Sequence, residues 1–474
     1  MNWKIFSPEI YYLLVSLWFL AVSMRPHTQS RRNYFSALSL AAIGIVICLI
    51  TITSEGFLFI NTYQINLFSQ VFKVLLSFGL FLVICLCPNL TAVNEKHHAE
   101  FYMLLFVCTL AMMMLVSSVH LLPIYLSLEL SSYSLYILVA LRRGKEMGLE
   151  AAIKYFLIGI FASAVMLFGM ALLYGTTRAA YLSEMAATLP AVIDNPAVVI
   201  GLLLTLSGFF FKLAVFPFHF WAPDVYQGAA NQVTAFIATA SKVAAMALLI
   251  RMAALSGGGT AGHYAVHVLV ALSIISMTVG NLAAITQKDV KRLLAYSTIA
   301  HAGYIMIGVL SMNPAGYSAV IFYAVALLMM KFTAFLVVVK VTDDDRNLQI
   351  DQLAGLHQRS PILALALMVS IFSLAGIPPT IGFTGKLFVF LAAMKQGYFT
   401  LVLIAMINVV VSLYYYLLIL KAAYLQKPDD ALPEVKLSAP AKVLAVSLIV
   451  LMVVVGFFPR DVLELAEAAS RTLL

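Results

Sequence analysis

The chain has 474 residues, of which 63% are hydrophobic and 11% are charged, and its formal net charge is +8. Its mean hydropathy is +0.99. A water-soluble domain carries about a quarter charged residues, so this composition excludes a soluble globular protein and predicts a polytopic membrane protein. The positive charge does not indicate nucleic acid as a partner, because the basic residues are spread over many connecting segments. The expected surroundings are a lipid bilayer.

Apolar stretches of about 20 residues are typical of membrane-spanning helices. We expect about fourteen such spans, joined mostly by short loops. They begin near residues 9, 34, 70, 100, 119, 153, 197, 232, 263, 290, 315, 361, 398 and 440. A transmembrane β-barrel would show short alternating segments instead of long apolar runs. The sequence therefore predicts an all-α polytopic membrane protein without a separate soluble domain.

The basic residues also predict an orientation, because lysine and arginine are enriched in cytoplasmic loops. The loops after odd-numbered spans hold most of them, including Arg31, Arg32, Arg142, Arg143, Lys291 and Arg292. The loops after even-numbered spans hold few. Both termini are therefore predicted on the outer, periplasmic side of a bacterial inner membrane.

Cofactor motifs are absent from the sequence. There is no Walker motif, dinucleotide fingerprint or cysteine cluster, and the four cysteines all fall in apolar spans. They have no histidine or carboxylate at ligand spacing, so they are interpreted as small hydrophobic residues. We expect no cofactor and no metal in this chain.

Four charged residues lie inside apolar stretches: Glu129, Lys212, Lys242 and Lys386. A charge at the centre of a membrane helix costs roughly 2.5–3.5 kcal/mol even on a lenient scale. Such residues usually face a protein interior or a wet cavity and mark ion or proton routes. The sequence thus indicates transport of protons or small cations. The alternative is a scaffold in which these charges only hold helices together.

Two of these charges are candidates for an ion pair. Glu129 has Ser132 on its own helix face, three residues later, and Lys212 is its expected partner from a neighbouring span. Lys242 has no carboxylate in its span, and burial favours the neutral form of a lysine. Lys242 and Lys386 are therefore predicted to accept and release protons.

Prolines interrupt two of the spans, one close to Lys212 and one before Lys386. Because proline removes a helical hydrogen bond, it frees the carbonyl four residues earlier. The carbonyls expected to be freed are that of Leu213, by Pro217, and those of Leu374 and Ala375, by the 378–379 proline pair. Free carbonyls at membrane depth are tolerated when they are buried or line a watery cavity. Paired broken helices indicate an inverted-repeat transporter, with spans four to eight and nine to thirteen as the halves.

Three further groups inside spans are weaker candidates. His301 lies mid-span beside serine, threonine and tyrosine, and His219 adjoins the first break. Histidine relays protons near neutral pH, but a single helix histidine is more often a packed, hydrogen-bonded residue. Lys331 lies in another apolar span and is a candidate relay.

Other polar residues near the spans have simpler interpretations. Lys73 and Lys154 fall near the predicted span ends, where a lysine side chain reaches toward the interface. The 414–416 tyrosine run is interpreted as packing or interface residues.

Three segments together resemble the antiporter-like subunits of respiratory complex I, and among these the subunit N type. They read FFFKLAVFPFHFWAPDVYQGA, TQKDVKRLLAYSTIAHAGY and AGIPPTIGFTGKLFVF, and the resemblance spans about residues 100–425. It implies fourteen helices, two inverted five-helix repeats (spans four to eight and nine to thirteen), and broken seventh and twelfth helices. The implied division is a three-helix segment at 1–99, repeats at 100–255 and 256–425, and a loop with the last span at 426–474.

The resemblance also implies a function, which is proton translocation along a mid-membrane axis of a complex I-type NAD(P)H/quinone oxidoreductase. Glu129 and Lys212 would be the coupling pair, Lys242 the central relay, Lys386 the terminal relay, and His301 would lie between. NAD, FMN, iron–sulfur clusters and quinone would belong to other subunits, and the partners would be other membrane subunits of the complex. Subunit M types usually have glutamate in place of Lys386, which favours subunit N or a multisubunit cation/proton antiporter.

Two departures from the family pattern stand out. Residues 228–236 read GAANQVTAF, where the family usually has two prolines (GAPTPVTAF), so the stiffness of this connection is in question. Lys331-Phe332-Thr333 replaces the usual Asn-Leu-Gly, and this extra lysine either serves as a relay or alters coupling. The alternative functions are a subunit of a sodium/proton antiporter, or of a hydrogenase- or ferredoxin-linked membrane complex.

Overall fold

The computed structural model describes residues 3–25, 29–144, 146–193, 195–254, 263–342, 346–427 and 434–473. Within them, thirteen helices are long and apolar enough to cross a membrane. The remaining predicted span, near residue 361, is present as two shorter helices, α17 (Pro361–Ala375) and α18 (Ile381–Lys395). The all-α polytopic prediction is confirmed. The predicted repeat boundary near residue 256 lies outside the described residues.

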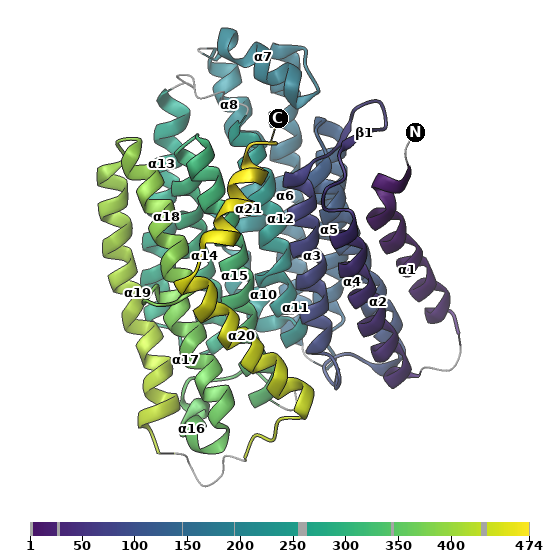
Figure 1. The fold of residues 1–474 in the computed structure, drawn as a ribbon, viewed down its shortest axis with the longest axis vertical. Helices are drawn as coiled ribbons and strands as arrows, with labels where there is room; N and C mark the ends of the chain where they lie inside the picture. Colours follow the sequence, from purple (N-terminus) through teal and green to yellow (C-terminus); the bar gives the residue numbers. More distant parts are fainter. Residues whose placement is uncertain are drawn as a thin grey trace.

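The first part of the chain forms helices on one side of the bundle (Figure 1). These are η1 (Trp3–Phe6), α1 (Ser7–Ser23), α2 (Ser30–Ile50), α3 (Leu67–Cys85), η2 (Glu95–His97), α4 (His98–Ser117), α5 (Leu121–Ala140), α6 (Glu146–Thr177) and α7 (Leu182–Val192). A short antiparallel hairpin, β1 (Gly56–Leu58) and β2 (Tyr63–Ile65), connects α2 to α3 with Phe57 opposite Gln64. The sequence analysis did not predict this hairpin.

The rest of the chain supplies the interior and the opposite side. The helices are α8 (Pro196–Thr205), α9 (Ser207–Leu213), α10 (Trp221–Gly228), α11 (Asn231–Ala238), α12 (Ala240–Ala254), α13 (His263–Ile285), α14 (Val290–Leu310), α15 (Pro314–Val341), η3 (Asp351–Leu353), α16 (Leu356–Arg359), α17, α18, α19 (Phe399–Leu425), α20 (Ala439–Phe457) and α21 (Arg460–Ser470). Helices α20 and α21 run obliquely across α15, α17 and α18, and both chain ends lie at the same end of the bundle as β1 (Figure 1).

Three membrane stretches form the centre of the bundle. The most apolar window of the α11–α12 stretch is wholly buried, and 94% of it is buried in α14 and in α15, whereas α2 and α20 have only 28% and 22% buried. Charged side chains on α12, α14 or α15 are therefore enclosed by protein. This is the condition under which a membrane helix tolerates them.

Both predicted helix breaks are present. Helix α9 ends at Ala214, which has left-handed backbone geometry (φ +62°), and α10 begins seven residues later at Trp221. Helix α17 ends at Gly376 (φ +86°), and α18 begins at Ile381. A third interruption, at Thr239 between α11 and α12, was not predicted.

Candidate functional site

Four buried lysines follow one another through the centre of the protein: Lys212 on α9, Lys242 on α12, Lys331 on α15 and Lys386 on α18, each at most 4% exposed. Lys242 interacts electrostatically with both Lys212 and Lys331. Lys331 in turn interacts with Lys386. The structure therefore joins the predicted lysines into one row, which we call the lysine row, and places Lys331 inside it.

Lys242 is held at the first helix break. Its Nζ donates to the backbone carbonyl of Lys212, 2.5 Å away, at the end of α9, and lies 4.8 Å from the centre of the Trp221 ring. The last carbonyls of a helix lack partners within that helix, and its carboxyl end favours a cation. The break thus supplies a site for an ammonium group that, among the described residues, has no carboxylate within ion-pair distance.

Lys386 is held at the second break in a related way. Its Nζ donates to the carbonyls of Leu374, at 2.8 Å, and Ala375, at 3.0 Å, and lies 5.1 Å from the Tyr304 ring centre. These are the two carbonyls that the proline pair was predicted to free. At the first break the lysine instead binds the carbonyl one residue before Leu213. The two lysines also come from different places relative to their breaks. Lys386 lies on α18, which is part of the broken helix that binds it, whereas Lys242 lies on α12, in the membrane span after the broken one.

The predicted Glu129–Lys212 ion pair is not formed in this structure. Glu129 accepts a hydrogen bond from Ser163 on α6, while Ser132 donates to the Leu128 carbonyl instead. Within the described residues, no carboxylate lies within 4.0 Å of Lys212 Nζ, which also has no hydrogen-bond partner. The two side chains nevertheless interact electrostatically. The structure therefore shows the pair open, with the carboxylate satisfied by a hydroxyl.

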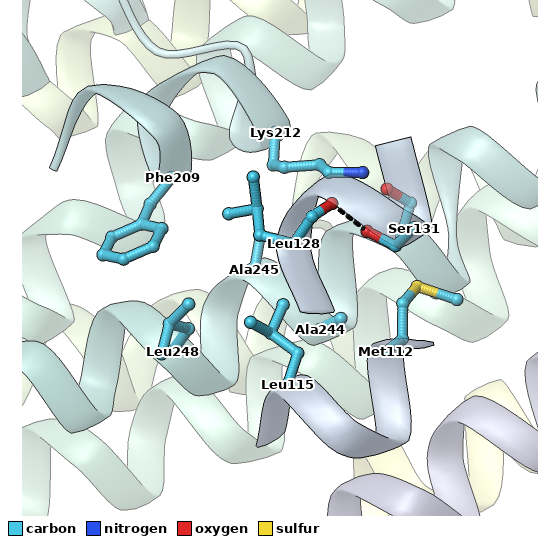
Figure 2. A pocket seen from close by; sticks show the side chains of 10 residues that line it. Met112, Leu115, Leu128, Ser131, Phe209, Lys212, Ala244, Ala245 and Leu248 are labelled. Atoms are coloured by element: carbon cyan, nitrogen blue, oxygen red, sulfur yellow. Dashed lines mark hydrogen bonds between the residues drawn. The ribbon is translucent and has the colours of Figure 1, made fainter. Parts of the chain in front are cut away.

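Lys212 projects into a narrow pocket between α4, α5, α9 and α12 (Figure 2). Its polar lining consists of Lys212, Ser131 and Ser241. Apolar side chains form the remainder: Met112, Leu115, Leu128, Phe209, Ala244, Ala245 and Leu248. Ser131 donates to the Leu128 carbonyl, as the dashed line in Figure 2 shows, so its hydroxyl is not bonded to the lysine.

Lys331 connects the two halves of the row. Its Nζ donates to the Leu294 carbonyl at 3.0 Å and also to the Ser297 hydroxyl, both on α14. His301 interacts electrostatically with both Lys331 and Lys386. Lys331 thus interacts electrostatically with both Lys242 and Lys386, and its role as a relay stays a prediction.

His301 lies at the centre of a hydroxyl network. Its Nδ1 is 2.5 Å from the Tyr323 hydroxyl, and its Nε2 is 3.3 Å from that of Tyr416. The neighbouring Tyr415 hydroxyl donates to Asn281 at 2.9 Å. Only Tyr414 of the three consecutive tyrosines is exposed. The interpretation of the run as packing or interface residues agrees with this burial, and the structure adds that Tyr416 also contacts His301.

His219 lies in the first break and is separate from the lysine row. Its ring is flanked by Phe216 and Phe220, with ring centres 5.5 and 4.2 Å away. Its Nδ1 has no hydrogen-bond partner among the described residues. The break itself is tied to α13 by a hydrogen bond from Phe216 N to Ser276. His219 thus lies in the loop between α9 and α10, and no contact joins it to a lysine of the row within the described residues.

The connection that lacks the two family prolines is held by basic side chains. Arg142 donates to the carbonyls of residues 227, 228 and 229 at 2.8 to 3.1 Å. Lys291 donates to the Ala229 carbonyl at 2.9 Å. These carbonyls are the free carboxyl end of α10, so the bonds cap that helix and fix the turn into α11 without proline.

The predictions for Lys73 and Lys154 are corrected by the structure. Lys73 is fully buried, and its Nζ lies 2.7 Å from a carboxylate oxygen of Glu9. Lys154 is partly exposed, but it pairs with Glu150 at 2.7 Å and Asp224 at 2.8 Å. Neither side chain merely extends to the interface. Hydropathy located both near span ends, and only the packing of other helices around them reveals their carboxylate partners.

Comparison with known proteins identifies the family of the chain. The profile of the family described as NADH:quinone oxidoreductase/Mrp antiporter, transmembrane, matches residues 118–412. A protein named NADH-quinone oxidoreductase subunit N 2, from Syntrophobacter fumaroxidans, is 64% identical over the full length of both chains. The chain belongs to this family. Another member, NADH-quinone oxidoreductase subunit N of Nitrosomonas europaea, is 36% identical over 98% of this chain and 96% of its own.

Solved structures show the same fold. A chain of respiratory complex I from Thermus thermophilus, determined with bound aureothin, is 34% identical with a TM-score of 0.84, covering 96% of this chain and 98% of its own. A chain of the Mrp complex from a Dietzia species has a TM-score of 0.86 at 21% identity, covering 100% and 98%. The second likeness shows only that the fold is shared.

Proposed function

We propose that this chain is a proton-translocating membrane subunit of a complex I-type NADH:quinone oxidoreductase, and that protons cross it along the lysine row. The observation that carries the proposal is the row itself: four buried lysines that interact electrostatically and, within the described residues, have no carboxylate within 4.0 Å. A fixed cluster of buried like charges would be strongly unfavourable. Groups that can exchange a proton relieve it by being charged in turn.

The open Glu129–Lys212 pair supplies the coupling step. When the two groups are close, the carboxylate stabilises the ammonium of Lys212. When Glu129 is instead bonded to Ser163, as in this structure, the ammonium loses its counter-ion and favours transfer of its proton toward Lys242. The carbonyl that already binds Lys242 Nζ belongs to Lys212, so the two sites are joined through one residue.

The second half of the row continues the transfer. A proton leaving Lys242 enters the environment of Lys331, which is bonded to Ser297. From there it reaches Lys386, whose charge is supported by two carbonyls. His301, with Tyr323 and Tyr416 on its two nitrogens, serves as a hydroxyl-linked relay between Lys331 and Lys386. Because neighbouring sites titrate together, the row acts as a unit.

The wider setting of the chain is part of the proposal. It would hold no redox group, and NAD, FMN, iron–sulfur clusters and quinone would be bound by other subunits. Its partners would be other membrane subunits, as the names of its relatives and the complex I structure suggest. It would lie in a bacterial inner membrane with both termini outside, and residues 100–255 and 256–425 would be inverted repeats.

A subunit of a sodium/proton antiporter is the second candidate, but its support is the fold at 21% identity. The 64% identical relative supports the quinone-linked function instead. Transport that depends on sodium would reverse this preference.

The test is proton pumping in membrane vesicles that carry the whole complex, with donor-driven quinone reduction recorded alongside. Lys212→Ala, Lys242→Ala and Lys386→Ala should assemble, reduce quinone and lose pumping. Lys395→Ala is the matched control, because this lysine lies on the same helix as Lys386 but is exposed. Normal pumping by all three variants, with reduced assembly, would support a scaffold and overturn the proposal.

A further inference from the structure

A second buried charge cluster lies outside the lysine row, in the first three helices. Glu9 on α1 is 1% exposed, and one of its oxygens, Oε1, is 2.7 Å from Lys73 Nζ on α3. The Tyr63 hydroxyl, from β2, donates to the same oxygen at 2.6 Å. Lys73 Nζ also lies 5.4 Å from the Tyr63 ring centre. Three segments thus converge on one ion pair.

Arg251 extends this cluster from α12. Its guanidinium donates to Gln64 at 3.1 Å and to the Val116 carbonyl at 3.0 Å, and it interacts electrostatically with Tyr63. Strand β2 is bridged at Tyr63 to Ser118, which follows Ser117. The cluster therefore contains one carboxylate and two cations, and joins α12 to the hairpin and to the end of α4.

Several buried polar atoms of the cluster have no protein partner among the described residues. They are Glu9 Oε2, Gln70 Oε1, Lys73 Nζ (which is ion-paired with Glu9), Ser117 Oγ and Arg251 Nε. Buried polar atoms are nearly always hydrogen-bonded, to ordered water where protein supplies no partner. The unsatisfied atoms come from four different segments around Tyr63, so we infer that water occupies the cluster.

Polar residues continue from the cluster along the contact between α1 and α3. On α3 they recur on one helix face at Gln70, Lys73 and Ser77, and on α1 at Glu9, Tyr12 and Ser16, all of them buried. The Tyr12 and Ser77 hydroxyls are 2.6 Å apart, one helical turn from the ion pair. Spacings of three and four residues place each set on a single face. The polar face runs from the hairpin end of the bundle toward its middle.

The depth of the ion pair relative to the lysine row follows from helix geometry. Gly79 of α3 packs against Ala240 of α12, and a methyl group at Gly79 would lie 3.2 Å from the Ala240 side chain. Ala240 is two residues before Lys242. Six residues separate Lys73 from Gly79, which is about 9 Å along a helix. At the hairpin end, Arg251 lies over the Phe68 ring, so Lys73 stands between the lysine row and this end.

The Lys212 pocket leads in the same direction. Its lining on α12 runs from Ser241 to Leu248, toward Arg251, and on α4 from Met112 to Leu115, toward Ser117. Leu115 and Leu248 lie on the opposite side of the pocket from Lys212 and Ser131, whereas Leu128 lies beside Lys212 (Figure 2). An apolar constriction of this kind blocks ions and protons when dry and passes them when wetted.

We propose that Glu9, Lys73 and Tyr63 form a second proton-exchange site, through which protons pass between the lysine row and the hairpin end of the bundle. This inference rests on the proposed function and adds to it an exit, or entry, on the side of α1 and α3. The apolar part of the Lys212 pocket separates the two sites and keeps them from exchanging protons continuously.

A proton can move from Lys73 to Glu9 without changing the total charge of the ion pair. An N–H bond of the Lys73 ammonium breaks, the nitrogen keeps the electron pair, and an O–H bond forms on the Glu9 carboxylate 2.7 Å away. The products are an amine and a carboxylic acid, so the pair stays neutral. A proton arriving from the row restores the ammonium. The new O–H bond of Glu9 then breaks, the oxygen keeps the electron pair, and the proton passes to water in the cluster, which restores the carboxylate.

The alternative is a static ion pair that only fastens α1 to α3. Lys73→Arg separates the two roles, because arginine keeps the charge and the pairing but does not release its proton. The double variant Glu9→Gln/Lys73→Met is the second test. It leaves no unpaired charge, and replacing a whole buried pair by neutral groups of similar size is often tolerated. Lys96→Arg, at an exposed position, is the matched control.

Each variant is measured in vesicles with the whole complex, as protons pumped per quinone reduced, beside Lys242→Ala. We expect Lys73→Arg and the double variant to assemble, to reduce quinone, and to lose as much pumping as Lys242→Ala. Normal pumping by either assembled variant, while Lys242→Ala fails to pump, would overturn the second site and leave the proposed function intact. Normal pumping by Lys242→Ala as well would overturn the proposed function itself.

Discussion

A methyl group at Gly376 should disturb Lys386 without removing its charge. Gly376 ends α17 with φ +86°, and a Cβ there would lie 3.0 Å from Lys386 Cδ and 3.2 Å from its Nζ. In Gly376→Ala the lysine side chain must therefore shift by a few tenths of an ångström, which weakens its hydrogen bonds to the carbonyls of Leu374 and Ala375. Hydrogen bonds to a charged group are worth about 1.5–3 kcal/mol each, so weakening both places up to about 3 kcal/mol against charged Lys386.

The backbone strain of this variant has a matched control. Left-handed geometry costs an alanine about 1–2 kcal/mol, and Gly397 has the same geometry, at φ +84°, with no atom within 4 Å of its Cβ position. Gly397→Ala therefore carries the strain without the contact to the lysine. The difference between the two variants reports only the displacement of Lys386.

The assay is proton pumping per quinone reduced in vesicles, with the amount of assembled complex measured on native gels. A loss of up to about 3 kcal/mol at one site of a relay corresponds to up to roughly two powers of ten in its occupancy, so Gly376→Ala should assemble and pump more slowly than the unaltered complex. Gly397→Ala should pump normally. If the two variants pumped equally well, the binding of Lys386 by the broken helix would have no part in transport.

Three further predictions follow from the contacts around the row. Arg142→Met should destabilise the complex by about 3 kcal/mol or more, because three carbonyls at the end of α10 lose a charged donor, whereas the exposed Arg143→Met should leave its thermal midpoint unchanged. Tyr416→Phe removes the hydroxyl that contacts His301, so this variant should assemble normally and pump more slowly. Tyr414→Phe, at an exposed position, is its control. Equal pumping rates would exclude the Tyr416 hydroxyl from the route. Ser163→Ala removes the hydroxyl that donates to Glu129 on α5. Glu129 should then pair with Lys212 on α9, and pumping should uncouple from quinone reduction. Unchanged coupling would contradict the role given to the open pair.

Local sequence rules predicted the spans and one of the two lysine sites well. Each expected span begins within seven residues of a helix in the structure, as at residues 153 and 146 for α6. The reason is that a span depends on the composition of about 20 consecutive residues. The carbonyls that bind Lys386 could be predicted because proline acts at a fixed offset along the chain.

Contacts between helices could not be predicted in the same way. The partner of Glu129 is a serine on another helix, and the pairing of Lys73 with Glu9 joins positions 64 residues apart. Neither depends on spacing within one span. Thr239 interrupts its helix without proline or glycine, so no local signal marks the break. The polar spacing of α3 at 70, 73 and 77 was visible in the sequence, and it is the signal that would have identified the buried lysine.

Lys242→Arg, compared with Lys242→Ala, tests the central claim most directly. Arginine keeps a positive charge beside the Lys212 carbonyl and the Trp221 ring but does not release its proton. If protons move through the row by exchange, both variants should assemble and reduce quinone, and both should fail to pump. If Lys242→Arg pumped normally, a fixed charge would suffice at the centre of the row, and proton transfer through this lysine would be contradicted.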